Sequence, residues 1–133
     1  AYAARYIAKN LVASGVAAEM LVQISYAIGM ARPVSIYVNT YGKSHVAKTD
    51  GEIAKEIERL FDLRPKAIEH SLKLRQPMFS ETAAYGHMGR KNEVITKTFK
   101  RRCHKTKSME VELFTWEKLD KVKELKAVFG IDN

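Results

Sequence analysis

The sequence predicts an α+β fold in which antiparallel β-hairpins pack against amphipathic helices. Two hydrophobic periods alternate along its 133 residues: a period near 3.6 typical of helices and a period of two typical of half-buried strands. Hydrophobic residues make up 46% of the chain and charged residues 29%, an ordinary balance for a globular protein. A chain of this length forms about one domain and is long enough to bury a hydrophobic core.

The first forty residues predict one helix followed by one hairpin. Residues 21–28 alternate with period two, as do residues 34–39, so these runs are expected to pair as antiparallel strands around a turn at 29–33. Gly15 stands where it would end the preceding helix. The apolar stripe of that helix consists of Ala4, Ile7, Ala8, Leu11 and Val12.

The middle of the chain predicts further helices. Thr49 followed by Glu52 has the spacing of a capping box, which predicts a helix over residues 50–61. Pro65 suits the first turn of a brief third helix, whose inward residues are Ile68 and Leu72. Residues 82–90 contain two glycines, so we expect irregular or short helical structure there.

The last third predicts a second hairpin and a closing helical segment. Residues 93–99 and 109–115 are rich in β-forming side chains, and Lys97 is expected to pair across the strands with Glu110 or Glu112. The apolar residues of 116–129 show partial helical periodicity; they are Leu119, Val122, Leu125, Ala127 and Val128.

Much of the positive charge is local. The formal net charge is +8, and residues 97–107 hold six Lys and Arg with no acidic residue. Such a run is usually a solvated loop, although it also allows a nucleic-acid-binding module with Phe99 and His104 interleaved. No window approaches the roughly 20 apolar residues of a membrane span. A single cysteine permits no internal disulfide framework, so we expect a reducing cytoplasm.

Composition and spacing alone identify no active site. The four histidines stand apart in the sequence, without the spacing of metal ligands; they are His45, His70, His87 and His104. Residues 86–89 form only a G-x-x-G, which falls short of a phosphate-binding loop. Cys103 lies among cations but lacks an adjacent base. We therefore predict no catalytic, cofactor-binding or metal-binding residue within this chain.

Several segments together resemble one enzyme family. Residues 1–10 (AYAARYIAKN), 23–29 (QISYAIG) and 82–90 (TAAYGHMGR) look like the C-terminal third of S-adenosylmethionine synthetase, also called methionine adenosyltransferase. Residues 61–65 (FDLRP) fit the same pattern. Residues 114–118 (FTWEK) stand where the family commonly has Phe-Pro-Trp-Glu-Lys. On this resemblance the chain divides into a family core (1–90), an inserted β-hairpin (91–113) and a C-terminal tail or helix (114–133).

The resemblance implies an activity for the parent enzyme. Family members join ATP to L-methionine and release phosphate and pyrophosphate, assisted by Mg²⁺ and K⁺, at sites between the subunits of a homo-oligomer, a dimer or tetramer. The residues that bind phosphate and metal belong to regions preceding the position of Ala1. The chain alone is therefore expected to bind no cofactor and to be inactive, and nucleic acid is not the expected partner.

Ile28 is the one candidate substrate contact. By pattern it continues the buried face of the strand, which favours core packing. By resemblance, the isoleucine of the family's Ser-Tyr-Ala-Ile-Gly segment lies against the methionine side chain, and residues 25–29 reproduce that segment. The competing hypotheses are a basic nucleic-acid-binding module and an oligomerisation module.

Overall fold

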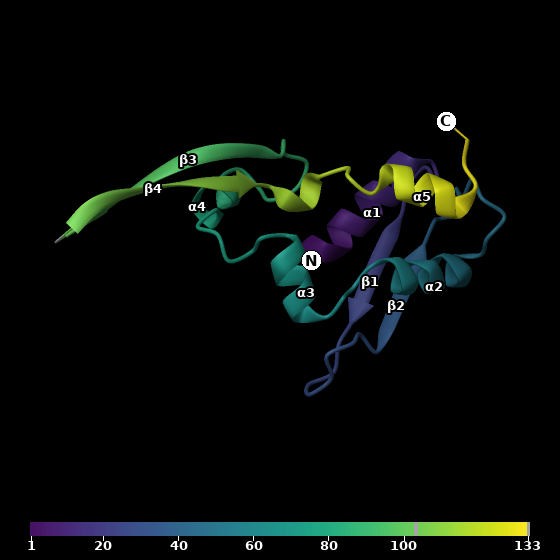
Figure 1. Cartoon of the computed structure of the whole chain (residues 1–133). Helices are drawn as coiled ribbons and strands as arrows, with labels where there is room; N and C mark the ends of the chain where they lie inside the picture. The colour runs from purple at the N-terminus through teal and green to yellow at the C-terminus, as the bar shows by residue number, and fades with distance from the viewer. Residues whose placement is uncertain (103, 133) are drawn as a thin grey trace.

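The helices and hairpins follow the order that the hydrophobic periods predict. The computed structural model describes residues 1–102 and 104–132 (Figure 1). Its elements in chain order are α1 (Tyr2–Ser14), β1 (Leu21–Ser25), β2 (Ser35–Asn39), α2 (Asp50–Leu60), α3 (Pro65–Ser71), α4 (Phe79–Ala83), β3 (Glu93–Arg101), β4 (His104–Leu113), the 3₁₀ turn η1 (Thr115–Glu117) and α5 (Val122–Phe129).

Helix α1 ends where the sequence predicts. Gly15 adopts a left-handed conformation at φ 89°, which is costly for residues with a Cβ atom. Its N–H donates to the carbonyl oxygen of Val12 at 3.1 Å, and the N–H of Val16 donates to Leu11 at 3.2 Å. These bonds satisfy carbonyls that the last turn of a helix leaves without partners.

Strands β1 and β2 form the predicted antiparallel hairpin, but β1 is shorter than expected. Val22 pairs with Val38 and Ile24 with Ile36, on the face that packs against the core. The last pair is Ser25 with Ser35, so Ile28 does not continue the buried face. The chain instead turns at residues 27–30, where Met30 N–H donates to Ala27 at 3.2 Å.

The capping box of α2 is present as predicted. The Thr49 hydroxyl accepts from Glu52 N–H at 3.3 Å, while the Glu52 carboxylate accepts from Thr49 N–H at 2.7 Å. Helix α3 begins with Pro65 in its first turn. The segment after it forms the short helix α4, which then gives way to turns through residue 89.

Strands β3 and β4 form a longer hairpin than the sequence predicts. The predicted pairing of Lys97 with Glu110 or Glu112 is wrong. The register places Lys97 opposite Met109, while Glu110 lies opposite Thr96. Lys97 Nζ instead donates to the carbonyl oxygen of Pro77 at 2.7 Å and forms an ion pair with Glu81 at 2.8 Å. The lysine therefore attaches the hairpin to the start of α4.

Two hydrophobic clusters share helix α1. The larger cluster lies between α1, the β1–β2 hairpin, α2 and α5, and its buried residues are Ile7, Leu11, Val16, Val38, Ile53, Ile57, Leu63 and Leu125. The smaller one lies at the base of the β3–β4 hairpin, and its buried residues are Ala3, Leu72, Met78, Val111, Leu113, Phe114 and Trp116. Because Ala3 and Ile7 are one helical turn apart, α1 joins the clusters.

Replacement of Thr49 by Ala should lower the free energy of unfolding by about 1 kcal/mol, because the first turn of α2 loses its cap. Chemical denaturation monitored by circular dichroism measures the change. The control is Lys55→Ala in the same helix, at an exposed position. It should change stability by less than about 0.5 kcal/mol. Equal losses in the two variants would show that the cap contributes nothing specific.

Candidate functional site

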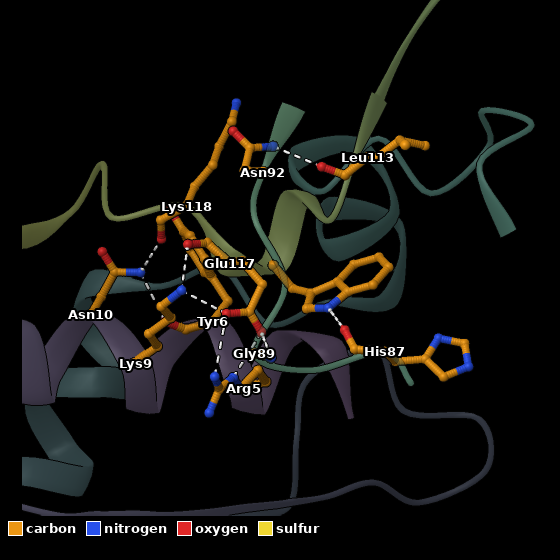
Figure 2. Close-up of polar contacts among 11 residues, drawn as sticks. Arg5, Tyr6, Lys9, Asn10, His87, Gly89, Asn92, Leu113, Glu117 and Lys118 are labelled. Carbon is orange, nitrogen blue, oxygen red and sulfur yellow. Dashed lines mark hydrogen bonds and ion pairs between the residues drawn. The ribbon is translucent and has the colours of Figure 1, made fainter. Parts of the chain in front are cut away.

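A buried carboxylate joins three segments that are far apart in the sequence. The Glu117 side chain is only 1% exposed and accepts hydrogen bonds from two cations of α1 (Figure 2). Arg5 donates from Nε to Oε1 at 3.0 Å and from Nη2 to Oε2 at 3.2 Å, and Lys9 Nζ donates to Oε2 at 2.6 Å. The backbone N–H of Gly89 completes the set at 3.0 Å.

Local structure explains why these groups meet. Arg5 and Lys9 are four residues apart on α1, so they project from one face of the helix. Phe114 takes a left-handed conformation at φ 54°, which starts the 3₁₀ turn that contains Glu117. Gly89, at φ 72°, points its N–H at the carboxylate from the loop after α4.

The surroundings of Glu117 keep it ionised. Burial alone would raise the pKa of this carboxyl, but the hydrogen bonds from Arg5, Lys9 and the Gly89 backbone outweigh burial and hold the pKa below its usual value. A carboxylate with charge-assisted hydrogen bonds to two cations is a strong cross-link. Its effect is to fix the C-terminal segment to α1 and to the 84–90 loop.

Aromatic contacts hold the same loop from its other side. Trp116 is fully buried and stacks on Tyr2, with ring centroids 3.8 Å apart and planes 14° from parallel. Its indole N–H donates to the carbonyl oxygen of His87 at 2.7 Å, as Figure 2 shows. Tyr2 and His87 are hydrogen-bonded at 2.8 Å between the hydroxyl and Nδ1. His87 thus acts in a structural network.

Asn10 provides a further attachment of the C-terminal segment to α1. It is buried, and its amide nitrogen donates to the carbonyl oxygens of Tyr6 and Lys118, both at 2.8 Å. Its side-chain oxygen accepts from the backbone N–H of Lys121 at 3.1 Å. A buried amide with these three bonds leaves little polar surface uncompensated.

A second carboxylate anchors the base of the β3–β4 hairpin. The Glu112 side chain is 9% exposed and pairs with Lys73 at 2.9 Å and Lys118 at 2.5 Å, and Asn92 donates to it at 3.2 Å. Burial would raise the pKa of Glu112, but the hydrogen bonds from these three residues lower it to about 2. Figure 2 also shows Asn92 bound to the Leu113 carbonyl oxygen.

A largely apolar pocket of about 960 Å³ lies between the start of α1 and α3. Its volume is at the upper end of the range for small-molecule sites. The Tyr6 hydroxyl at its edge donates to Asp120, and burial raises the pKa of Tyr6 above its usual range. Residues lining the pocket include Tyr6, Ile7, Leu63, Ile68, Leu72 and Lys121.

The candidate residues identified from sequence do not converge. Ile28 is fully exposed in the turn between β1 and β2, away from the Glu117 network. His45 and His70 lie on separate surface segments, while Cys103 and the His104 side chain lie outside the described residues. Within residues 1–102 and 104–132, no group of three or more His, Cys, Asp or Glu is arranged to hold a metal ion.

No helix in the described part of the chain is long and apolar enough to cross a membrane.

Comparison with known proteins identifies the family. The family described as "S-adenosylmethionine synthetase, C-terminal domain" matches residues 1–101, about three quarters of the chain. The chain belongs to this family.

Relatives of the S-adenosylmethionine synthetase family match nearly the whole chain. S-adenosylmethionine synthases of Phocaeicola vulgatus and of Bacteroides fragilis strain ATCC 25285 are 67% and 69% identical to it over 131 residues, which is 98% of this chain. A solved structure, titled "Structure of an Unusual S-adenosylmethionine synthetase from Campylobacter jejuni", matches 96% of the chain with a TM-score of 0.76 at 30% identity. That match confirms the predicted α+β fold of the family's C-terminal domain.

This chain spans only part of those relatives. It covers 30% of the length of the Phocaeicola and Bacteroides proteins and 29% of the Campylobacter chain. Because the alignments span 98% of this chain, residues 91–113 lie inside the region shared with the Phocaeicola and Bacteroides relatives. The designation of 91–113 as an insertion therefore stays a prediction for the wider family.

Sequence reasoning did not find the Glu117 and Glu112 networks of this family member. Glu117 and Arg5 are 112 residues apart, so no local spacing connects them. The one available signal was the resemblance of residues 114–118 to a family segment, which contains both Trp116 and Glu117.

Replacement of Glu117 by Ala should lower the free energy of unfolding by about 3 kcal/mol, because two cations and a backbone N–H lose a buried partner. Denaturant titration followed by Trp116 fluorescence measures the loss. Glu124→Ala is the matched control, since Glu124 is exposed and pairs with Lys121 three residues away. Its loss should stay below about 0.5 kcal/mol, and a Glu117 effect of that size would contradict the proposed cross-link.

Acid should destabilise the protein between about pH 5 and pH 2. The folded-state pKa of Glu112 is about 2, below the ordinary 4.5, so its contribution is fully present above pH 5 and is lost as pH falls toward 2. Glu112→Gln should therefore flatten the plot of unfolding free energy against pH in that window. The exposed neighbour Glu110→Gln serves as control and should leave the slope unchanged. A Glu112→Gln variant with the original slope would show that Glu112 does not cause the loss of stability in acid.

Proposed function

We propose that this chain is the C-terminal part of an enzyme that forms S-adenosylmethionine from ATP and L-methionine and releases phosphate and pyrophosphate. Its identity of 67–69% to the Phocaeicola and Bacteroides S-adenosylmethionine synthases is the observation that supports this proposal most strongly. The matching fold of the Campylobacter synthetase supports the same conclusion. The parent protein would be a transferase.

In this proposal the chain contributes scaffold and part of a substrate pocket. A triphosphate leaving group requires cations where negative charge develops. In the described residues the partly exposed cations Arg5 and Lys9 are already bound to Glu117, and no metal-ligand cluster is present. We therefore assign phosphate binding, Mg²⁺ and K⁺ to the other part of the enzyme, and expect the isolated chain to be inactive.

Ile28 is our candidate contact for the methionine side chain. It lies at the far end of the β1–β2 hairpin, fully exposed, and other apolar side chains of the same loop are exposed with it: Tyr26, Met30 and Val34. An exposed apolar group of this kind commonly marks a surface that contacts a ligand or another chain. The loop begins and ends at a regular strand pair, Ser25 with Ser35, which fixes its position.

We further propose that the parent enzyme is a homo-oligomer, a dimer or tetramer, and that it acts in the cytoplasm. The exposed apolar end of the β1–β2 hairpin supports the first proposal, because an active site shared between subunits would cover it. The single cysteine of the chain supports a reducing compartment.

A chimera tests the proposed activity. The C-terminal part of the Bacteroides fragilis synthase is replaced by this chain, which is 69% identical to it. Since the parts should fit, the chimera should form S-adenosylmethionine at a rate within about tenfold of the parent, as an assay with ATP, L-methionine, Mg²⁺ and K⁺ measures. The isolated chain should form none. A folded, oligomeric chimera without activity would contradict the proposal.

In the active chimera, Ile28→Ala should raise the KM for L-methionine about tenfold or more. Loss of apolar contacts of this size in a substrate pocket is worth about 1–3 kcal/mol. Stability should not change, because Ile28 is exposed in the isolated domain. Val94→Ala, an exposed apolar residue of the other hairpin, is the matched control. An unchanged KM in the Ile28 variant would remove this residue from the methionine site.

A further inference from the structure

The β3–β4 hairpin projects away from the rest of the molecule. Figure 1 shows its two strands leaving the body beyond α4 and extending as an isolated ribbon. Its base is buried, since Val111 and Leu113 belong to the smaller hydrophobic cluster. Its outer half is exposed, and the strands remain paired there, with Phe99 opposite Lys107. The outer half is thus a two-stranded arm that is open on both faces, with one shift of register between Phe99 and Arg101.

This arm carries most of the excess charge of the protein. Residues 97–107 hold six Lys and Arg and no acidic residue, which gives this segment a formal charge of +6 against +8 for the whole chain. Four of those cations have exposed side chains: Lys100, Arg102, Lys105 and Lys107. Within the described part of the chain, none of these four forms an ion pair. Lys97, at the inner end of this segment, pairs with Glu81 of α4 and is not part of the exposed outer half.

The composition of the arm favours a polyanion over a protein surface. Protein interfaces are depleted in lysine and centred on aromatic and other apolar residues. Phe99 is the one large apolar side chain exposed among the described residues of 97–107, and it is only 38% exposed. Hydroxyl groups accompany the lysines instead, and Thr98 and Ser108 face each other across the strands at 3.2 Å. Lysines and hydroxyls are common phosphate ligands.

The shape of the arm selects one polyanion. The major groove of B-form DNA is about 12 Å wide and admits a two-stranded antiparallel ribbon. The A-form major groove of double-stranded RNA is too narrow for side chains to enter. We propose that the outer half of the β3–β4 hairpin docks in the major groove of duplex DNA, with Lys100, Arg102, Lys105 and Lys107 contacting phosphates along its walls. This activity is independent of the proposed synthesis of S-adenosylmethionine.

Salt dependence measures the number of phosphate contacts. Four contacts give a slope of about −3.6 in a plot of log K against log salt, so affinity should fall roughly 100-fold between 50 and 200 mM salt. Fluorescence anisotropy of the 133-residue chain with a labelled 20-base-pair DNA duplex provides this slope. Absence of binding at 50 mM salt, or a slope near zero, would overturn the proposal.

A charge-matched pair of variants locates the contacts. The arm variant carries Lys100→Gln, Lys105→Gln and Lys107→Gln, and it should lower the magnitude of the slope by about 3. The control carries Lys55→Gln, Lys66→Gln and Lys123→Gln, three exposed body lysines that form no ion pair within the described residues. It has the same net charge and should retain the slope of the parent. Equal losses in the two variants would mean that DNA is attracted by the overall positive charge of the protein, and would refute a binding site on the arm.

Competing polyanions test the shape argument. Unlabelled DNA duplex should displace the labelled duplex at lower concentration than double-stranded RNA of equal length, because only the DNA groove accepts the ribbon. Vesicles containing phosphatidylserine should compete less well than DNA at equal accessible charge. Stronger competition by the RNA or by the vesicles would show that the arm prefers a ligand other than the DNA groove, and would refute the proposal. Circular dichroism confirms that each variant is folded.

Discussion

The rest of this domain depends on the buried carboxylate of Glu117. The last twenty residues and the first ten are more than a hundred positions apart, so only long-range contacts can hold them together. Glu117 makes that connection with Arg5 and Lys9, and in the same place binds the backbone of Gly89. Because its partners lie in two other segments, removal of this group breaks the one polar contact that all three segments share.

The hydrophobic clusters and the polar network support each other. Ala3 and Leu11 lie in different clusters on one helix, while Arg5 and Lys9 project from the intervening turns toward Glu117. Next to Glu117 in the sequence, the buried Trp116 contacts the same two segments through its stacking on Tyr2 and its hydrogen bond to the His87 carbonyl oxygen. The result is a rigid support from which two structures extend, the Ile28 loop and the β3–β4 hairpin.

Local signals in the sequence predicted local structure well. The capping box at Thr49, the left-handed cap at Gly15 and the period-two runs of the first hairpin are all confirmed. Prediction failed where the answer depended on distant residues. Alternation alone extended the first strand to Ile28, whereas a turn ends it at Ser25, and Lys97 bonds to Glu81 because strand register places no acid opposite it.

Hydrogen exchange at two protons tests the central role of Glu117 most directly. The Gly89 amide and the Trp116 indole N–H both donate within the network, to the Glu117 carboxylate and to the His87 carbonyl. If the network opens only when the domain unfolds, both protons should exchange with a free energy close to that of global unfolding. Exchange of the Gly89 amide at the rate of an unprotected loop amide would show that the carboxylate does not hold the loop.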